Sequence, residues 1–251
     1  MRQILTWVRT TLFLCGALLA GGGLSGCNGV NTPGKMEWVQ PRTTTPHVGT
    51  TYAIRGWMGV YSKGIDEMAK AINDRGSTAY VFQDQQYIEL GKTMVERYKA
   101  DPNHEPICFI GHSRGVDAEI IIARELEKAG VVVDYIGCLD SVDQDTVTAN
   151  VRLCYNYWMP GPLPGNLLHG IPLKQEEGST GQLFNLNLDT DYRAWRQDAT
   201  DHISLDDDPW IQKRIVDHIM EICVERSKWT PPVQQPPFKH VQPDPMPPPK
   251  R

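Results

Sequence analysis

The sequence predicts an α/β fold in three layers, with a mostly parallel sheet covered by helices on both faces. In the first half of the chain, short apolar runs alternate with segments whose apolar residues recur at helical spacing. The apolar runs carry few polar residues on either face, which is typical of parallel strands buried on both sides. Residues 47–229 are numerous enough for one domain with a substantial core.

Each expected element follows from its own local pattern. The apolar runs that predict strands are residues 51–54, 78–82, 106–110, 131–139, 151–157 and 182–188. The segments with helical spacing are residues 65–74, 88–98, 116–128 and 209–226. Gly130 is expected to close the third helix. Asp208 before Pro209 opens the last one, because an aspartate cap followed by a first-turn proline is typical of helix starts.

The first 26 residues are interpreted as a targeting signal that is not part of the fold. Arg2 and Arg9 supply positive charge, residues 12–20 are apolar, and Leu-Ser-Gly precedes Cys27. The apolar stretch is interrupted by glycines and is too short for a membrane-spanning helix. This pattern resembles a bacterial lipoprotein signal. The resemblance implies that Cys27 receives acyl chains such as palmitate and tethers the protein to a membrane of the cell envelope.

The position after the lipidated cysteine bears on the expected location. Asn28 is not the aspartate associated with retention at the inner membrane, so we expect the outer membrane, with the protein facing the periplasm. An ordinary secretory signal with an incidental cysteine is the alternative.

Two further segments lie outside the expected domain. Residues 27–46 are expected to be a linker, and residues 230–251 a proline-rich disordered tail, because such a run lacks the donors and apolar side chains of a packed core. The tail has either no role or binds the cell wall or a partner. The net charge of −5 is mild and no block of Lys or Arg is present, so no nucleic-acid partner is expected.

The cysteine pattern does not indicate a disulfide framework or a metal site. The cysteines of the expected domain are Cys108, Cys138, Cys154 and Cys223. The first three fall in expected strands, and neighbouring parallel strands rarely have the geometry of a disulfide, so buried free thiols are expected. No C-x-x-C or histidine-rich spacing is present. No metal and no organic cofactor is therefore expected.

The motif G-H-S-R-G at residues 111–115 is the strongest functional signal. It lies directly after an apolar run and before a helical pattern. A strand, a sharp turn and a helix in this order raise the hydroxyl of Ser113 to the edge of a sheet, and the flanking glycines avoid collisions in the strained turn. A serine hydroxyl becomes a strong nucleophile only when a base removes its proton, so a histidine is required.

With this motif, residues 51–226 resemble an α/β-hydrolase of the lipase and esterase type, without a large cap domain. The resemblance implies that the acid and the histidine follow the serine in that order. His202 fits as the base because it lies after the last expected strand and before the last helix. His169, in a loop, is the alternative base.

The acid is implied by a second local match. Residues 137–142, G-C-L-D-S-V, resemble the Gly-Leu-Asp-Pro run of some lipases, with serine in place of proline. The match implies that Asp140 orients the imidazole and stabilises its protonated form. Asp143, Asp189 and Asp191 are alternatives, and a role for Asp140 as a simple turn cap is also open.

The loop after the first strand is a candidate oxyanion hole, which needs two backbone N–H groups. R-G-W-M-G at residues 55–59 resembles the His-Gly-x-x-Gly of the family, with Arg55 where histidine is usual. The amides of Trp57 and Arg114 are expected to form the hole, with Met58 as second choice for the former. A glycine turn without a further role is the alternative.

These expectations combine into a membrane-anchored serine hydrolase. It would cleave carboxylic (acyl) esters of small molecules or lipids through an acyl-enzyme on Ser113, with thioesters and amides left open. Residues 159–181 are expected to overhang the site as an apolar acyl-binding wall. The alternatives are an inactive hydrolase-fold envelope lipoprotein that binds a ligand or partner, and a structural lipoprotein held by its tail.

Overall fold

The computed structural model describes residues 33–57, 62–144, 146–160, 169–190 and 201–231. Their main feature is a six-stranded sheet in the order β2-β1-β3-β4-β6-β8, and every pairing in it is parallel. The strands are β1 (Thr50–Ile54), β2 (Thr78–Phe82), β3 (Ile107–His112), β4 (Tyr135–Leu139), β6 (Leu153–Trp158) and β8 (Gln182–Asn187). The helices are α2 (Lys63–Asp74), α3 (Tyr87–Lys99), α4 (Arg114–Lys128) and α5 (Pro209–Ile222).

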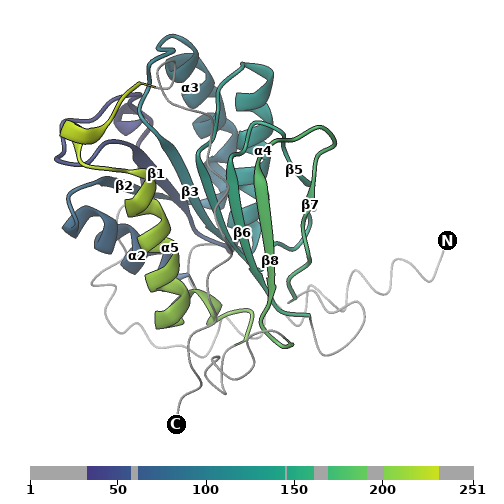
Figure 1. Ribbon diagram of the computed structural model, residues 1–251. Coiled ribbons are helices and arrows are strands. Elements are labelled where there is room, and N and C mark those ends of the chain that lie inside the picture. The colour runs from purple at the N-terminus through teal and green to yellow at the C-terminus, as the bar shows by residue number, and fades with distance from the viewer. Residues whose placement is uncertain (1–32, 58–61, 145, 161–168, 191–200, 232–251) are drawn as a thin grey trace, which may run out of the picture. The chain divides into compact units, whose positions relative to one another are not determined.

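The helices cover both faces of the sheet, so the predicted three-layer α/β fold is confirmed. Helices α2 and α5 pack on one face, and α3 and α4 pack on the other (Figure 1). The side chains of β3 alternate between the two cores: Cys108 and Ile110 join α2 and α5, whereas Phe109 joins α3 and α4. Burial on both faces is the reason why this strand appears in the sequence as an unbroken apolar run.

The last helix begins as predicted and ends earlier. The side chain of Asp208 accepts hydrogen bonds from the N–H groups of Trp210 and Ile211, with Pro209 in the first turn. The helix ends at Ile222 rather than near residue 226. Beyond it the backbone changes partners, because the carbonyl of Val224 accepts the N–H of Val48 from the N-terminal part of the domain.

The fourth strand is shorter than the apolar run that predicts it. It begins at Tyr135 instead of residue 131. The N–H of Val131 donates to the carbonyl of Leu126 and so closes α4. Of the residues between α4 and the strand, Val133 forms only an isolated parallel bridge with Val151. A second sheet of two short parallel strands, β5 (Thr146–Val147) and β7 (Lys174–Gln175), was not predicted, because such short polar strands leave no apolar run.

The packed unit begins at Pro33, so part of the expected linker 27–46 belongs to it. Val39 is fully buried in the core on the α3 and α4 side. The N–H of Gly34 donates to the carbonyl of Val81 in β2. The expected signal segment 1–26, the lipidation site Cys27 and residues 232–251 of the tail lie outside the described residues.

The prediction of buried free thiols is confirmed for Cys108, Cys138, Cys154 and Cys223.

Among the helices of the described part, none has the length and apolarity needed to cross a membrane.

Candidate active site

Ser113 occupies a strained turn between β3 and α4. Its backbone has φ 54° and ψ −121°, outside the regions that non-glycine residues normally adopt. The flanking glycines permit close approach of the neighbouring backbone. A Cβ on Gly115 would lie 2.2 Å from the carbonyl oxygen of Ile54, and one on Gly111 would lie 2.7 Å from the nitrogen of Val116. The motif therefore folds as the sharp strand-turn-helix connection that its glycines predict.

Three of the predicted site residues meet at this turn. His202 Nε2 lies 3.0 Å from Ser113 Oγ, and His202 Nδ1 lies 3.1 Å from Asp140 Oδ2. Both distances are those of hydrogen bonds. Asp140 is fully buried and His202 is 8 % exposed. The structure thus brings together a serine, a histidine and a carboxylate from three distant parts of the chain.

Asp140 is held rigidly at the carboxyl end of β4. Its second carboxylate oxygen, Oδ1, accepts the N–H of Met159 at 2.7 Å, and its own N–H donates to the carbonyl of Tyr157. Burial raises the pKa of Asp140, whereas the hydrogen bond and positive charge of His202 act in the opposite direction. Both oxygens of the carboxylate thus have a partner, and one of these partners is the imidazole.

The alternative acids and the alternative base occupy other places. The backbone N–H of Asp143 donates to Asp117 Oδ1 in a turn beside α4. Asp189 follows β8 and its N–H donates to Asn187 Oδ1. Asp191 lies outside the described residues. His169 is near enough for its charge to lower the pKa of Asp140, but the imidazole that contacts the serine is that of His202.

The expected oxyanion loop lies against the serine turn. A Cβ on Gly56 would be 3.4 Å from Ser113 Cβ and 3.1 Å from the carbonyl oxygen of His112. Trp57 comes next in this loop, whereas Met58 lies outside the described residues. Arg114 begins α4, where the first N–H groups of a helix have no acceptor within it. The loop and the helix start therefore both lie next to Ser113.

Arg55 anchors this loop from below. Its side chain is 1 % exposed, and its Nε and Nη2 donate to Asp66 Oδ1 of α2 at 2.9 and 2.8 Å. An arginine that makes two hydrogen bonds to one carboxylate gives a fixed geometry. Arg55 thus ties the loop to the neighbouring helix.

A second set of polar residues beneath the turn was missed by the sequence reasoning. His112 Nε2 lies 2.6 Å from the carbonyl oxygen of His202, and its Nδ1 lies 3.0 Å from Ser62 Oγ. Ser62 Oγ also accepts the N–H of Gly56 at 3.0 Å. No motif contains Ser62, and the G-x-S-x-G motif leaves the residue at the position of His112 unspecified. The partners come together only in the folded chain.

The rim of the site combines apolar surface with one cation. Trp57 is 61 % exposed and Ile203, next to His202, is 40 % exposed. The side chain of Arg114 is largely exposed, and its Nε lies 3.4 Å from Asp84 Oδ2. Of the expected acyl-binding wall 159–181, residues 161–168 lie outside the described part of the chain, whereas Leu173 is buried in the core.

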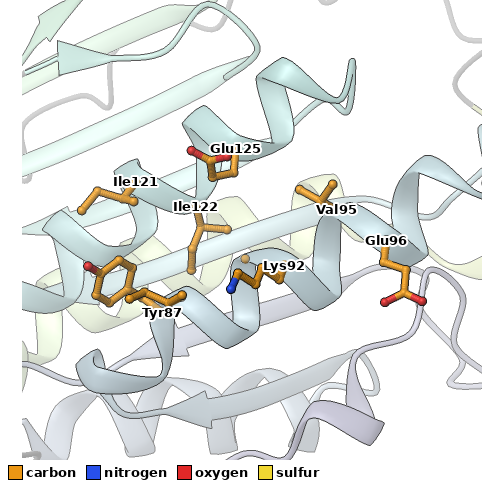
Figure 2. Close-up of a pocket in the computed structure, with 9 residues that line it drawn as sticks. Tyr87, Lys92, Val95, Glu96, Ile121, Ile122 and Glu125 are labelled. Carbon is orange, nitrogen blue, oxygen red and sulfur yellow. The ribbon is translucent and has the colours of Figure 1, made fainter.

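An apolar groove between α3 and α4 is separate from these residues. It has a volume of about 380 Å³, and its lining includes Tyr87 and Val95 of α3 and Ile122 of α4 (Figure 2). None of the serine, histidine and aspartate side chains that meet at the turn lines it. This groove is therefore not the place where a bond to Ser113 would form.

Comparison with known proteins gives similarity to solved structures only. No family model matches the chain, and no curated protein matches it. Among solved structures, the chain is similar to a novel cutinase-like protein from Cryptococcus sp., with 13 % identity and a TM-score of 0.43. The likeness covers 72 % of this chain and 97 % of that one.

Proposed function

We propose that the protein is a serine hydrolase that cleaves carboxylic esters through an acyl-enzyme on Ser113. The observation that carries this proposal is the unbroken hydrogen-bonded series from Ser113 Oγ through both nitrogens of His202 to Asp140. A strained turn holds its serine, and a fully buried carboxylate ends it. Groups in these positions suit nucleophilic attack on a carbonyl.

The first half of the reaction forms the acyl-enzyme. His202 Nε2 takes the proton from Ser113 Oγ as the oxygen bonds to the carbonyl carbon of the ester. Asp140 accepts the Nδ1–H of the resulting imidazolium and stabilises its charge. The backbone N–H groups of Trp57 and Arg114 receive the negative oxygen of the tetrahedral intermediate. His202 then gives its proton to the leaving alkoxide, and the C–O bond of the ester breaks.

The second half returns the free enzyme. Water attacks the acyl carbon while His202 accepts its proton. The bond to Ser113 Oγ breaks, and His202 returns the proton to that oxygen. The products are a carboxylic acid and a free serine, so no oxidant, reductant or cofactor enters the balance.

The rim favours substrates with an apolar group near the ester. Trp57 belongs to the loop that lies next to Ser113, and Ile203 directly follows His202. Exposed apolar side chains are therefore neighbours of the reacting groups in the sequence. Such surface gains free energy when an acyl chain covers it, at about 25 cal/mol per Å². The proposed lipid anchor at Cys27 would hold the domain at the outer membrane of a cell envelope, close to lipid esters.

The test is hydrolysis of a series of 4-nitrophenyl esters by the purified full-length protein. We expect turnover that is lost in Ser113→Ala and in His202→Ala. His47→Ala is the matched control, because His47 Nδ1 donates a hydrogen bond to the backbone carbonyl of Cys223 and takes no part in the site. Turnover that survives in Ser113→Ala would contradict the acyl-enzyme on Ser113. A folded wild type that hydrolyses none of the esters would favour the binding lipoprotein instead.

A further inference from the structure

We propose that His112 is a positioning residue of this site and that, together with Ser62, it joins the base loop and the oxyanion loop into one hydrogen-bonded unit. This inference rests on the proposed esterase function. It concerns residues that touch neither the scissile bond nor Ser113 Oγ. It starts from the contacts of His112 with the carbonyl of His202 and with Ser62, and of Ser62 with the N–H of Gly56.

The directions of these bonds follow from the chemistry of the groups and from the charge state of His112. The carbonyl oxygen of His202 can only accept, so His112 Nε2 carries a proton and donates it. The backbone N–H of Gly56 can only donate, so Ser62 Oγ accepts there. When His112 is neutral, its Nδ1 carries no proton, so the hydroxyl of Ser62 donates to it. A neutral His112 thus has one donor and one acceptor, and each has a partner.

The surroundings keep His112 neutral. Burial, and after it the positive charge of His202, lower the pKa of His112 to about 4. The two imidazole rings lie close, with centroids 5.3 Å apart. A protonated His112 would repel the imidazolium that His202 becomes during the reaction. A neutral His112 holds the backbone of His202 without this penalty.

Asp206 is the competing partner and fits less well. Its Oδ1 lies 3.6 Å from His112 Nδ1, beyond hydrogen-bond distance, whereas Ser62 Oγ is at 3.0 Å. The Oδ2 of Asp206 accepts the N–H of Ile65 at the start of α2. Asp206 thus lies beside the unit and does not replace Ser62 in it.

The position of His112 explains why one residue can align the serine, the loop of the base and the loop of the oxyanion amides. It is the last residue of β3 and directly precedes Ser113, so it is built on a buried central strand. From there its two ring nitrogens reach the loop of the base and, through Ser62, the loop of the oxyanion amides. Displacing a reacting group by about 1 Å can cost about 10²-fold in rate. Loss of this unit is therefore expected to lower kcat more than it changes KM.

The experiment compares kcat and KM for a 4-nitrophenyl ester in four single variants. His112→Leu removes both hydrogen bonds, and Ser62→Ala removes the link to Gly56 and leaves the one to His202. His112→Gln restores a donor near the position of Nε2. Tyr52→Phe is the control. Tyr52 lies on β1, next to β3, and the change deletes its buried hydrogen bond of 2.8 Å to Tyr98 of α3, away from the site.

We expect His112→Leu to lower kcat by about 10- to 100-fold with KM within about twofold, and Ser62→Ala to lower it less. His112→Gln should recover part of the loss. The double variant of His112→Leu and Ser62→Ala should lose no more than His112→Leu alone, because both changes break one unit. If His112→Leu does not fold, Ser62→Ala and His112→Gln decide the question.

Several results would overturn the inference, and they differ from failure of the proposed function. An active wild type with unchanged kcat in folded His112→Leu, or in folded Ser62→Ala if the former does not fold, overturns the positioning role alone. A loss of kcat in these variants that is no larger than the loss in Tyr52→Phe also overturns the positioning role. A folded wild type without any turnover overturns the esterase proposal and this inference with it.

Discussion

At the scale of single residues, the central feature is a carboxylate whose two oxygens have different tasks. Asp140 Oδ2 meets the imidazole of His202, while Oδ1 accepts the N–H of Met159. The first contact selects the tautomer of the base, and the second fixes the carboxylate in place. This division allows catalysis and folding to be separated by substitution.

Asp140→Asn tests that separation. The amide oxygen can keep the bond from Met159, but an NH₂ group facing His202 Nδ1 imposes the wrong tautomer. By analogy with the aspartate of serine proteases, we expect kcat to fall by about 10³- to 10⁴-fold with a small change in the unfolding temperature. Asp143→Asn, at the rival position, should leave kcat unchanged. Equal losses in both variants would contradict the assignment of Asp140.

A buried carboxyl beside the site should make stability depend on pH. Burial, and then the negative charge of Asp207, raise the pKa of Asp206 from 3.8 to about 7. The folded state therefore binds more protons than the unfolded state between these values, and this contribution to stability is lost as pH rises through about 7. Asp206→Asn removes the titration and keeps an acceptor for Ile65.

Urea unfolding at a series of pH values checks this sign. The free energy of unfolding of Asp206→Asn minus that of the wild type should increase from pH 4 to pH 7. Above pH 7 this difference should stay constant. His112 acts in the opposite direction, because its pKa is lowered to about 4. Its contribution to the free energy of unfolding is therefore lost as the pH falls toward 4. A difference between Asp206→Asn and wild type that stays flat across this range would show that Asp206 is ionised in the fold.

At the scale of elements, the connection from β3 to α4 requires a residue without a side chain at position 115. A Cβ on Gly115 would lie 2.2 Å from the carbonyl oxygen of Ile54, a backbone atom that cannot rotate away. Gly91, in the middle of α3, is different, because a Cβ there would meet Ile122 at an ordinary 3.5 Å. The two glycines thus have opposite expected responses to alanine.

Gly115→Ala should destabilise the protein by at least about 1–3 kcal/mol, the usual cost of overpacking, and displace Ser113. Gly91→Ala should stabilise it by up to about 1 kcal/mol, since alanine is the better helix former. Thermal and urea unfolding measure both changes. A neutral Gly115→Ala with full activity would contradict the tight turn.

At the scale of the whole molecule, the N-terminal segment from Pro33 belongs to the core. Glu105 illustrates this, because its carboxylate accepts the N–H of Thr43 and the N–H of Gly49 and also pairs with Arg226. Burial acts to raise the pKa of Glu105, but the hydrogen bonds from Arg226, Gly49 and Thr43 outweigh it and lower the pKa overall. One buried carboxylate thus joins the start of the domain to its end.

Truncation tests this role. A chain that begins at Pro33 should unfold at the same urea concentration as the full-length protein. A chain that begins at His47 loses buried Val39 and the partners that Thr43 supplies, so its midpoint should fall clearly. Equal midpoints for both truncated chains would show that residues 33–46 contribute nothing to stability.

The sequence predicts those parts of this molecule that have a local signal. Apolar runs locate the six strands of the main sheet, and Asp208 with Pro209 locates the start of α5. The G-x-S-x-G pattern and the order of residues bring Ser113, Asp140 and His202 to attention. The role of Ser62 has no local signal, because it depends on side chains that meet only across the fold. Packing of residues 33–46 was missed for the same reason, since their few apolar residues, Met36, Trp38 and Val39, are too few to form a strand or helix pattern.

The most direct test of the central claim is covalent labelling of the full-length protein with a fluorophosphonate, followed by peptide mass spectrometry. Such a probe reacts with a serine that a base and an oxyanion site activate. We expect one adduct, on Ser113, that disappears in His202→Ala and persists in His47→Ala. An adduct on another serine, or no adduct in folded wild-type protein, would contradict it.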